Sequence, residues 1–216
     1  MILLFSGCPT FHPVSVVSPL NVSQFNLDLA EHPNRQAVNY VLEGLEHGFH
    51  LGFQPARRLR AAKRNKPSAI QNPHIIDEYV ANKVARSRVA GPFTSIPLPN
   101  LHVSSFGVIP KKGQPAKWCL IVDLSSPQGS SINDGINPDE FSRHYIKLDQ
   151  IISMVLKHGP GALLAKFDVE AAYRNIAVHL DDRYLQGMKW RGQFFVDPRS
   201  PLCPLCLIQW LIWWSG

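Results

Sequence analysis

The prediction of the fold starts from one stretch of the sequence, Gly161-Ala-Leu-Leu-Ala-Lys-Phe-Asp168-Val-Glu-Ala-Ala-Tyr173. Residues 162–167 form a short, mostly apolar run after a Gly-Pro-Gly turn, which is the pattern of a strand buried on both faces. Asp168 stands at the end of this strand, where helix-favouring residues begin. A carboxylate held rigidly at a sheet edge suits a divalent cation, but a carboxylate in this place can also act as the cap of the following turn. The stretch alone leaves both roles open.

The composition favours an acidic partner. The 216 residues carry 22 Lys and Arg against 16 Asp and Glu, which gives a net charge of +6 and favours nucleic acid. No apolar run is long enough to span a bilayer, residues 1–5 lack the basic flank of a secretory signal, and four cysteines form no disulfide framework in a chain of this size. We therefore expect an intracellular protein, in the cytoplasm or nucleus, with no membrane partner. The composition says nothing of its oligomeric state.

Basic residues are concentrated in one quarter of the chain. Residues 51–100 hold nine Lys and Arg against two acidic residues, so they carry +7 and the rest of the chain carries −1. The densest strip comprises Arg57, Arg58, Arg60, Lys63, Arg64 and Lys66. This basic strip either faces phosphates or is a solvated loop. The second interpretation stays open because no aromatic residue is interleaved for base stacking.

Hydrophobic spacing predicts three helices, at about residues 33–47, 72–88 and 148–158. Pro33 and Pro73 suit first helical turns, and Gly48 suits a helix end. The faces expected to point inward are Val38, Val41, Leu42, Leu45 and Phe49 for the first helix, Ile76, Tyr79, Val80 and Val84 for the second, and Leu148, Ile151, Ile152 and Val155 for the third. Residues 1–32 show no period and contain three prolines before residue 20, so we expect an extended or disordered lead-in.

Two hairpins are predicted. The first joins strands at 104–110 and 117–124 through a Lys-Gly-Gln-Pro turn, and the second joins strands at 184–190 and 193–197 through Arg191-Gly192. Residues 125–137, between the hairpins, have the composition of a loop. The first hairpin carries Lys111, Lys112 and Lys117 near its tip. These ammonium groups either clamp a triphosphate or grip a template strand, or they protect an edge hairpin from aggregation.

Several motifs occur together and in order along the chain. They are Gly91-Pro-Phe93, Leu98-Pro-Asn-Leu101, Phe106-Gly-Val-Ile-Pro-Lys-Lys112, Lys117-Trp-Cys-Leu-Ile-Val-Asp123-Leu, Ser131-Ile-Asn-Asp-Gly-Ile136, the Asp168 stretch, and Asp181-Asp-Arg-Tyr-Leu-Gln-Gly-Met-Lys-Trp190. Together, residues 33–197 resemble the fingers and first half of the palm of reverse transcriptases, with the closest likeness to DIRS-like retrotransposons of the tyrosine-recombinase kind. Each motif is weak alone, and the order and spacing carry the resemblance.

The resemblance implies an α+β fold. We expect a partial right-hand polymerase architecture, with a fingers hairpin and an incomplete antiparallel palm sheet with helices, preceded by a helical N-terminal region. The expected divisions are a lead-in at 1–32, a helical basic region at 33–90, reverse transcriptase fingers and partial palm at 91–197, and an atypical tail at 198–216.

The resemblance also assigns roles to matching residues. Asp168 and the backbone carbonyl of Val169 would bind Mg²⁺, of which the complete family uses two ions. Tyr173 would exclude a ribose 2′ hydroxyl, and Lys112, with Lys117 beside it, would contact the incoming triphosphate. The implied activity is that of an RNA-directed DNA polymerase, with an RNA template, a DNA primer and deoxynucleoside triphosphates as partners. Lys111 and the basic strip would contact nucleic acid.

Three departures from the family bear on activity. Cys119 stands where the family usually has a triphosphate-binding Arg, and a thiol supplies no cationic fork. The aromatic-x-Asp-Asp motif, which supplies the remaining metal carboxylates, is absent from the 216 residues, and Asp181-Asp182 lies too near Asp168 to replace it. Residues 198–216 depart from the family text and suggest a frameshift; their Cys203-Pro-Leu-Cys206 pair lacks the second pair that structural zinc requires.

We therefore expect a truncated retroelement copy that is inactive alone and binds Mg²⁺ weakly at most. Two alternatives stay open from the sequence: a non-catalytic nucleic-acid-binding remnant, and a pseudogene product without function.

Overall fold

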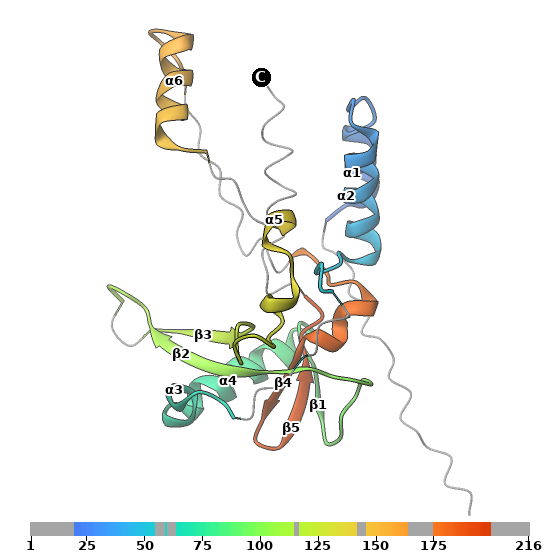
Figure 1. Ribbon diagram of the computed structural model, residues 1–216, viewed down its shortest axis with the longest axis vertical. Coiled ribbons are helices and arrows are strands. Elements are labelled where there is room, and N and C mark those ends of the chain that lie inside the picture. Colours follow the sequence, from blue (N-terminus) through green and yellow to red (C-terminus); the bar gives the residue numbers. More distant parts are fainter. Residues whose placement is uncertain are drawn as a thin grey trace, which may run out of the picture.

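A mixed sheet of five strands is the centre of the fold (Figure 1). The computed structural model describes residues 20–54, 59, 64–114, 117–141, 146–163 and 175–199. The helices are α1 (Val22–Asp28), α2 (Arg35–His47), α3 (Pro67–Gln71), α4 (Pro73–Ala85), α5 (Pro138–Phe141) and α6 (Leu148–His158), with short 3-10 helices η1 (Asn133–Gly135) and η3 (Leu180–Leu185). The strands are β1 (Ala90–Phe93), β2 (Val103–Pro110), β3 (Trp118–Asp123), β4 (Gly187–Trp190) and β5 (Gln193–Val196), in the sheet order β1-β5-β4-β2-β3. Across these ranges, every helix falls short of the length and apolar character that crossing a membrane requires.

The first predicted hairpin is confirmed almost to the residue. Strands β2 and β3 pair antiparallel, with Ser105 opposite Asp123 and Pro110 opposite Trp118. The neighbour of β2 on its other side is β4, and this pair is parallel, with Val103 opposite Gly187. The sheet is therefore mixed, which differs from the antiparallel palm sheet expected from the sequence. The reason is that η3 delivers the chain to β4 in the same direction as β2. The His102 amide donates to the Tyr184 carbonyl, and the His102 carbonyl accepts from the Gly187 amide.

The second hairpin is shorter than predicted. Its turn at Arg191-Gly192 is confirmed, because both residues adopt positive φ angles of 47° and 79°, as tight hairpin turns require. Tyr184 and Leu185 were expected at the start of the first strand, but they belong to η3. The strand begins only at Gly187, which lies so close to the backbone of His102 that an added Cβ would be 2.4 Å from its carbonyl oxygen.

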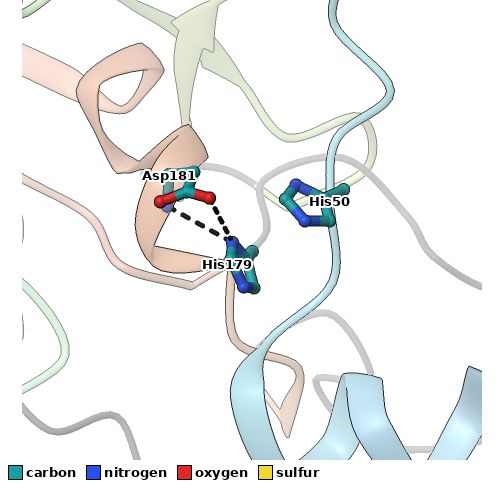
Figure 2. A group of neighbouring side chains, drawn as sticks. All are labelled: His50, His179 and Asp181. Atoms are coloured by element: carbon teal, nitrogen blue, oxygen red, sulfur yellow. Dashed lines mark hydrogen bonds and ion pairs between the residues drawn. The ribbon is translucent and has the colours of Figure 1, made fainter.

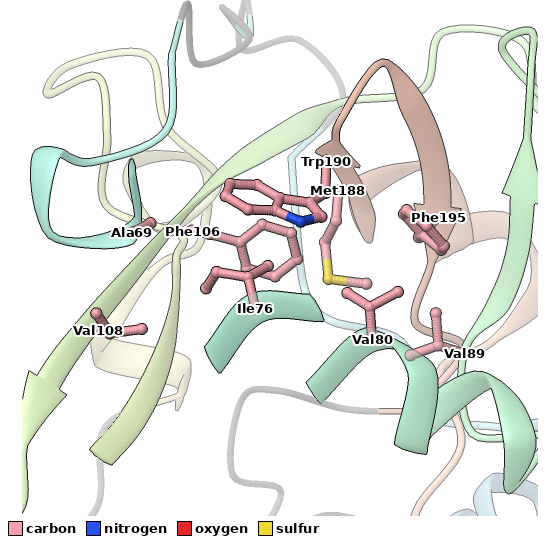
Figure 3. Packing of buried hydrophobic residues seen from close by; sticks show 9 residues of the cluster. All are labelled: Ala69, Ile76, Val80, Val89, Phe106, Val108, Met188, Trp190 and Phe195. Atoms are coloured by element: carbon pink, nitrogen blue, oxygen red, sulfur yellow. The ribbon is translucent and has the colours of Figure 1, made fainter. Parts of the chain in front are cut away.

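The main core lies between α4 and the sheet (Figure 3). Ile76 and Val80 of α4 pack with Phe106 of β2, Met188 and Trp190 of β4, and Phe195 of β5. The four residues predicted to point inward from this helix all contact this cluster, Ile76 and Val80 as buried members and Tyr79 and Val84 as partly buried ones.

Polar contacts fasten α4 to the second hairpin. The Asp77 carboxylate accepts hydrogen bonds from Trp190 Nε1 at 2.8 Å and from an Arg191 guanidinium nitrogen at 2.6 Å. These two donors, the indole first, hold the pKa of Asp77 below its ordinary value. The carboxylate therefore links a helix to the turn of a hairpin far along the chain.

Several short elements were not predicted, among them α1, α3 and β1. The lead-in prediction is wrong for Val22–Asp28, which forms α1: the Asn21 side chain caps its first turn and Phe25 packs on the α2 cluster of Val41, Leu45 and Phe49. Strand β1 forms at Gly91-Pro92, where only a helix end was expected, and α3 begins at Pro67. Each is too short to show a hydrophobic period, so the local pattern gave no signal.

The helices at 33–47 and 148–158 are confirmed as α2 and α6, and α2 ends at Gly48 as predicted. Their environments differ. Val38, Val41 and Leu45 of α2 are buried. Figure 1 shows α6 standing away from the sheet, and none of its residues is buried.

Candidate nucleic-acid interface

The β2–β3 hairpin is fixed at its base by residues 65–68, at the end of the basic strip. Asn65 accepts a hydrogen bond from the Phe106 amide at 2.8 Å and donates one to the Lys189 carbonyl at 3.0 Å, so it bridges β2 and β4. The Lys66 amide donates to the Phe106 carbonyl at 2.8 Å, and Ser68 Oγ accepts from the Val108 amide at 3.1 Å. Residues 65–68 therefore extend the pairing of β2 beyond the end of β4.

Lys66 lies across this base and pairs with β3. Its Nζ is 2.7 Å from Asp123 Oδ2, and its stem crosses Gly107, where an added Cβ would lie 2.8 Å from Lys66 Cδ. The Lys66 ammonium, followed by the Ser125 amide, holds the pKa of Asp123 below its ordinary value. The ammonium remains partly exposed, so this member of the basic strip forms an ion pair within the fold while still facing solvent.

The tip of the hairpin carries the other lysines. Lys111, Lys112 and Lys117 are all exposed. The Lys111 amide donates to the Lys117 carbonyl at 2.8 Å, which closes the tip, and Gly113 takes the positive φ of 72° that the turn needs. Within the described ranges, none of the three ammonium groups pairs with a carboxylate. The hairpin thus presents its positive charge on a tip whose base is held rigidly.

Cys119 lies on β3 near this tip, opposite Ile109. It is an exposed free thiol, and its sulfur makes a weak contact of 3.8 Å to the Leu120 carbonyl. The position faces solvent beside the lysines, where an Arg side chain would have room. The residue type, and not its burial, is what removes a cationic fork here.

The remaining predicted site residues lie outside the described residues. They are Asp168, Val169 and Tyr173 of the strand-and-turn stretch and Arg57, Arg58, Arg60 and Lys63 of the basic strip. The Cys203 and Cys206 pair of the tail, for which no metal was expected, also lies outside the described residues. Arg64, the first described member of the strip, is exposed. The structure therefore describes the three hairpin lysines and two members of the basic strip, Arg64 and Lys66. Their position relative to Asp168 stays a prediction.

Sequence reasoning missed the polar residues that depend on tertiary pairing. His102 is 4% exposed, its Nε2 has no hydrogen-bond partner among the described residues, and burial lowers its pKa. Asp182 was noted only as one of two acidic neighbours, but its carboxylate accepts a hydrogen bond from the Leu51 amide at 2.7 Å. No spacing in the sequence signals the burial of His102 or the contact of Asp182 with Leu51, because both depend on segments that are distant in the chain.

The comparisons with known proteins give a likeness of fold. The foamy viral protease-reverse transcriptase in complex with RNA/DNA hybrid aligns with a TM-score of 0.51 and 12% sequence identity, over 89% of this chain and 27% of that chain. The chain has a reverse-transcriptase-like fold. The native prototype foamy virus protease-reverse transcriptase aligns with a TM-score of 0.48 and 11% identity, over 89% of this chain and 26% of that one.

This likeness has a definite extent. The chain spans about a quarter of the length of these two foamy virus proteins, and at 12% identity the similarity concerns the fold alone. No family model matches the sequence, and no curated protein matches it. The fold assignment therefore rests on the arrangement of elements, with β2–β3 as the hairpin that carries the exposed lysines.

Proposed function

We propose that the chain is the fingers and beginning of the palm of a retroelement reverse transcriptase, of the DIRS-like kind that its motifs resemble. We further propose that the 216 residues bind nucleic acid but do not polymerise DNA by themselves. The observation that carries the binding proposal is the tip of the β2–β3 hairpin, where Lys111, Lys112 and Lys117 are exposed. The base of this hairpin is held by the hydrogen bond of Asn65 and the ion pair of Lys66. The reverse-transcriptase-like fold supports the assignment of this hairpin to the fingers.

Electrostatics explains why such a tip binds a phosphate backbone. Each lysine that neutralises a phosphate releases condensed counterions, so affinity falls steeply with salt and does not depend on base sequence. Lys66 contributes less than the tip lysines, because Asp123 at 2.7 Å already neutralises much of its charge. Arg64 is exposed at the edge of the same region and extends the positive surface.

The catalytic part of the proposal rests on the sequence motif alone. Asp168 and the Val169 carbonyl would hold Mg²⁺, and Tyr173 would select against ribose. Two Mg²⁺ ions repel each other and need several carboxylates between them, but the 216 residues contain no aromatic-x-Asp-Asp motif. With Cys119 in place of a cationic fork, the incoming triphosphate also loses a strong contact. These residues alone should therefore be catalytically incomplete.

Binding is tested by fluorescence anisotropy with a labelled RNA/DNA hybrid and with duplex DNA over a series of salt concentrations. The variant Lys111→Gln/Lys112→Gln should bind more weakly, and on duplex DNA its log–log salt slope should fall by about 1.8, since each lost phosphate contact contributes about 0.9. Arg86→Gln/Lys157→Gln removes the same charge from exposed positions away from the hairpin and should leave the slope close to that of the original protein. Equal slopes for both variants would make the tip an edge hairpin that its lysines merely keep soluble.

Catalysis is tested by primer extension on poly(rA) with Mg²⁺ or Mn²⁺. We expect no incorporation by the 216 residues. Incorporation that disappears in Asp168→Asn would contradict the incomplete site and would assign polymerase activity to this chain.

A further inference from the structure

Two histidines that are far apart in the sequence, His50 and His179, lie side by side just after the end of α2 (Figure 2). A parallel bridge between Phe49 and Val178 sets this approach. The Phe49 amide donates to the Ala177 carbonyl at 2.9 Å, and the His179 amide donates to the Phe49 carbonyl at 3.0 Å. Because Phe49 and Val178 are both buried, the backbone on either side of the pair is anchored in the core.

Gly48 makes this close approach possible. It has a φ of 92°, and an added Cβ would lie 2.7 Å from the His179 amide nitrogen and 2.7 Å from the Val178 carbonyl carbon. Both contacts are to backbone, which cannot move aside cheaply. The segments that carry His50 and His179 are therefore held together by main-chain geometry, with no need for the two rings to attract each other.

The side chains of this pair form a cluster with an acidic residue. The His50 and His179 ring centroids are 4.0 Å apart. His179 Nδ1 accepts a hydrogen bond from the Asp181 amide at 3.3 Å and lies 3.5 Å from Asp181 Oδ2, so a metal ion bound at this nitrogen takes the place of the amide hydrogen bond. One donor atom from each of His50, His179 and Asp181 lies within 4.8 Å of the other two. Ligands of a tetrahedral zinc ion are about 2 Å from the metal and so about 3–4 Å from one another. The Asp181 side chain is 79% exposed, so its rotation brings the carboxylate closer to the two imidazole rings.

A fourth residue fixes the orientation of His50. His50 Nδ1 lies 3.2 Å from Asp182 Oδ2, the same oxygen that accepts the Leu51 amide. A carboxylate oxygen only accepts hydrogen bonds, so Nδ1 carries the proton and Nε2 keeps its lone pair. A carboxylate that holds the far nitrogen of a ligating histidine is the arrangement typical of protein zinc sites.

We propose that His50, His179 and Asp181 bind Zn²⁺, with Asp182 as the positioning residue for His50, and that the ion ties α2 to η3. Two imidazole nitrogens and one carboxylate suit a borderline divalent cation better than Mg²⁺, which prefers oxygen ligands alone. Water completes the coordination, because the cluster lies at the surface. The site uses none of the residues proposed for polymerase chemistry, so it is independent of the function proposed above.

The experiment is calorimetric titration of the full chain with Zn²⁺, with folding checked by circular dichroism. We expect one zinc site that His50→Asn and His179→Asn each weaken at least tenfold. Asp182→Asn should weaken it by about tenfold, as loss of such an orienting carboxylate does. His47→Asn is the matched control, because His47 is exposed on the last turn of α2 and lies outside the cluster.

Thiols and misfolding need separate controls. Cys203→Ser/Cys206→Ser should retain the site, and the Co²⁺ form should show no thiolate charge-transfer band. Asp181 is exposed, so Asp181→Asn tests the ligand set even if a histidine variant fails to fold. Zinc binding that survives His50→Asn and Asp181→Asn, binding that the Cys variant abolishes, or no binding by the folded chain would each overturn the proposal.

Discussion

Helices α4 and α6 share a sequence pattern and differ in what surrounds them. Both were predicted from apolar residues spaced at helical intervals, and both form close to their predicted bounds. Ile76 of α4 is fully buried against the sheet, whereas Leu156 of α6 is 76% exposed and Ile152 is 47% exposed. Spacing therefore identifies a helix and its apolar face, but burial depends on a partner surface that the spacing does not encode.

The difference extends to the way each helix is held. α4 is fixed by the core of Phe106, Met188 and Trp190 and by the contacts of Asp77. Among the described residues, the side-chain hydrogen bonds of α6 are local. The Lys147 amide donates to the Gln150 side chain at 2.8 Å, and Ser153 Oγ donates to the Asp149 carbonyl at 2.8 Å. Local contacts stabilise an isolated helix weakly. We therefore expect the stability of the described fold to depend on α4 and hardly at all on α6.

The largest effect should come from the buried face of α4. Ile76→Ala removes a fully buried side chain beside Phe106 and leaves a cavity, so the free energy of unfolding should fall by about 2–5 kcal/mol. Urea denaturation followed by tryptophan fluorescence measures this, since Trp190 belongs to the same cluster. A loss below about 1 kcal/mol would mean that this core is loosely packed and would weaken the contrast between the helices.

Asp77→Asn should have the next largest effect. The amide has one acceptor oxygen where the carboxylate has two, so it keeps the hydrogen bond to only one of Trp190 Nε1 and Arg191. Because the Asp77 side chain is 40% exposed, we expect a loss of about 1 kcal/mol. The sign with pH follows from the lowered pKa of Asp77: its contribution is present above the ordinary carboxyl pKa and is lost as the pH falls through the lower folded value. The variant and the original protein should therefore converge in stability in acid. A constant difference at every pH would assign the effect to packing instead.

The sequence predicted what depends on neighbours in the chain. The β2–β3 hairpin followed from apolar residues on both sides of a Lys-Gly-Gln-Pro turn, and the exposed tip lysines followed from the same local pattern. The bounds of α6 followed from periodicity, and the end of α2 followed from Gly48. These features are set by contacts a few residues apart, which a single sequence displays directly.

The sequence could not predict what depends on register between distant segments. The ion pair of Lys66 with Asp123 exists because residues 65–68 pair along β2 while Asp123 lies opposite Ser105. The parallel pairing of β2 with β4 and the approach of His50 to His179 have the same origin. The part of the predicted site around Asp168 stays a prediction, because that residue lies outside the described residues.

A smaller effect is expected in the pH dependence of the free energy of unfolding, to which His102 beside β2 should contribute and His158 of α6 should not. Burial lowers the pKa of His102 in the folded state, so the unfolded chain binds a proton that the folded chain does not. Stability should therefore fall as the pH falls below about 6.5, the ordinary value for histidine. His102→Gln should flatten this slope relative to the original protein. His158→Gln, on the last turn of α6, is the matched control, and an equal flattening there would show that His102 is not the source.

The smallest effect should come from the same substitution placed on α6. Ile152→Ala removes the same atoms as Ile76→Ala, but at a side chain that is already 47% exposed. Alanine also favours a helix over isoleucine by a few tenths of a kcal/mol, roughly. The two contributions oppose each other, so we expect the free energy of unfolding to change by less than about 0.5 kcal/mol, measured in the same urea titration. A loss above about 1.5 kcal/mol would break the comparison, because it would require a surface in solution that covers the apolar face of α6. Repeating the titration at several protein concentrations would then identify the source, since a covering second copy makes the loss concentration-dependent and a covering segment of the same chain does not.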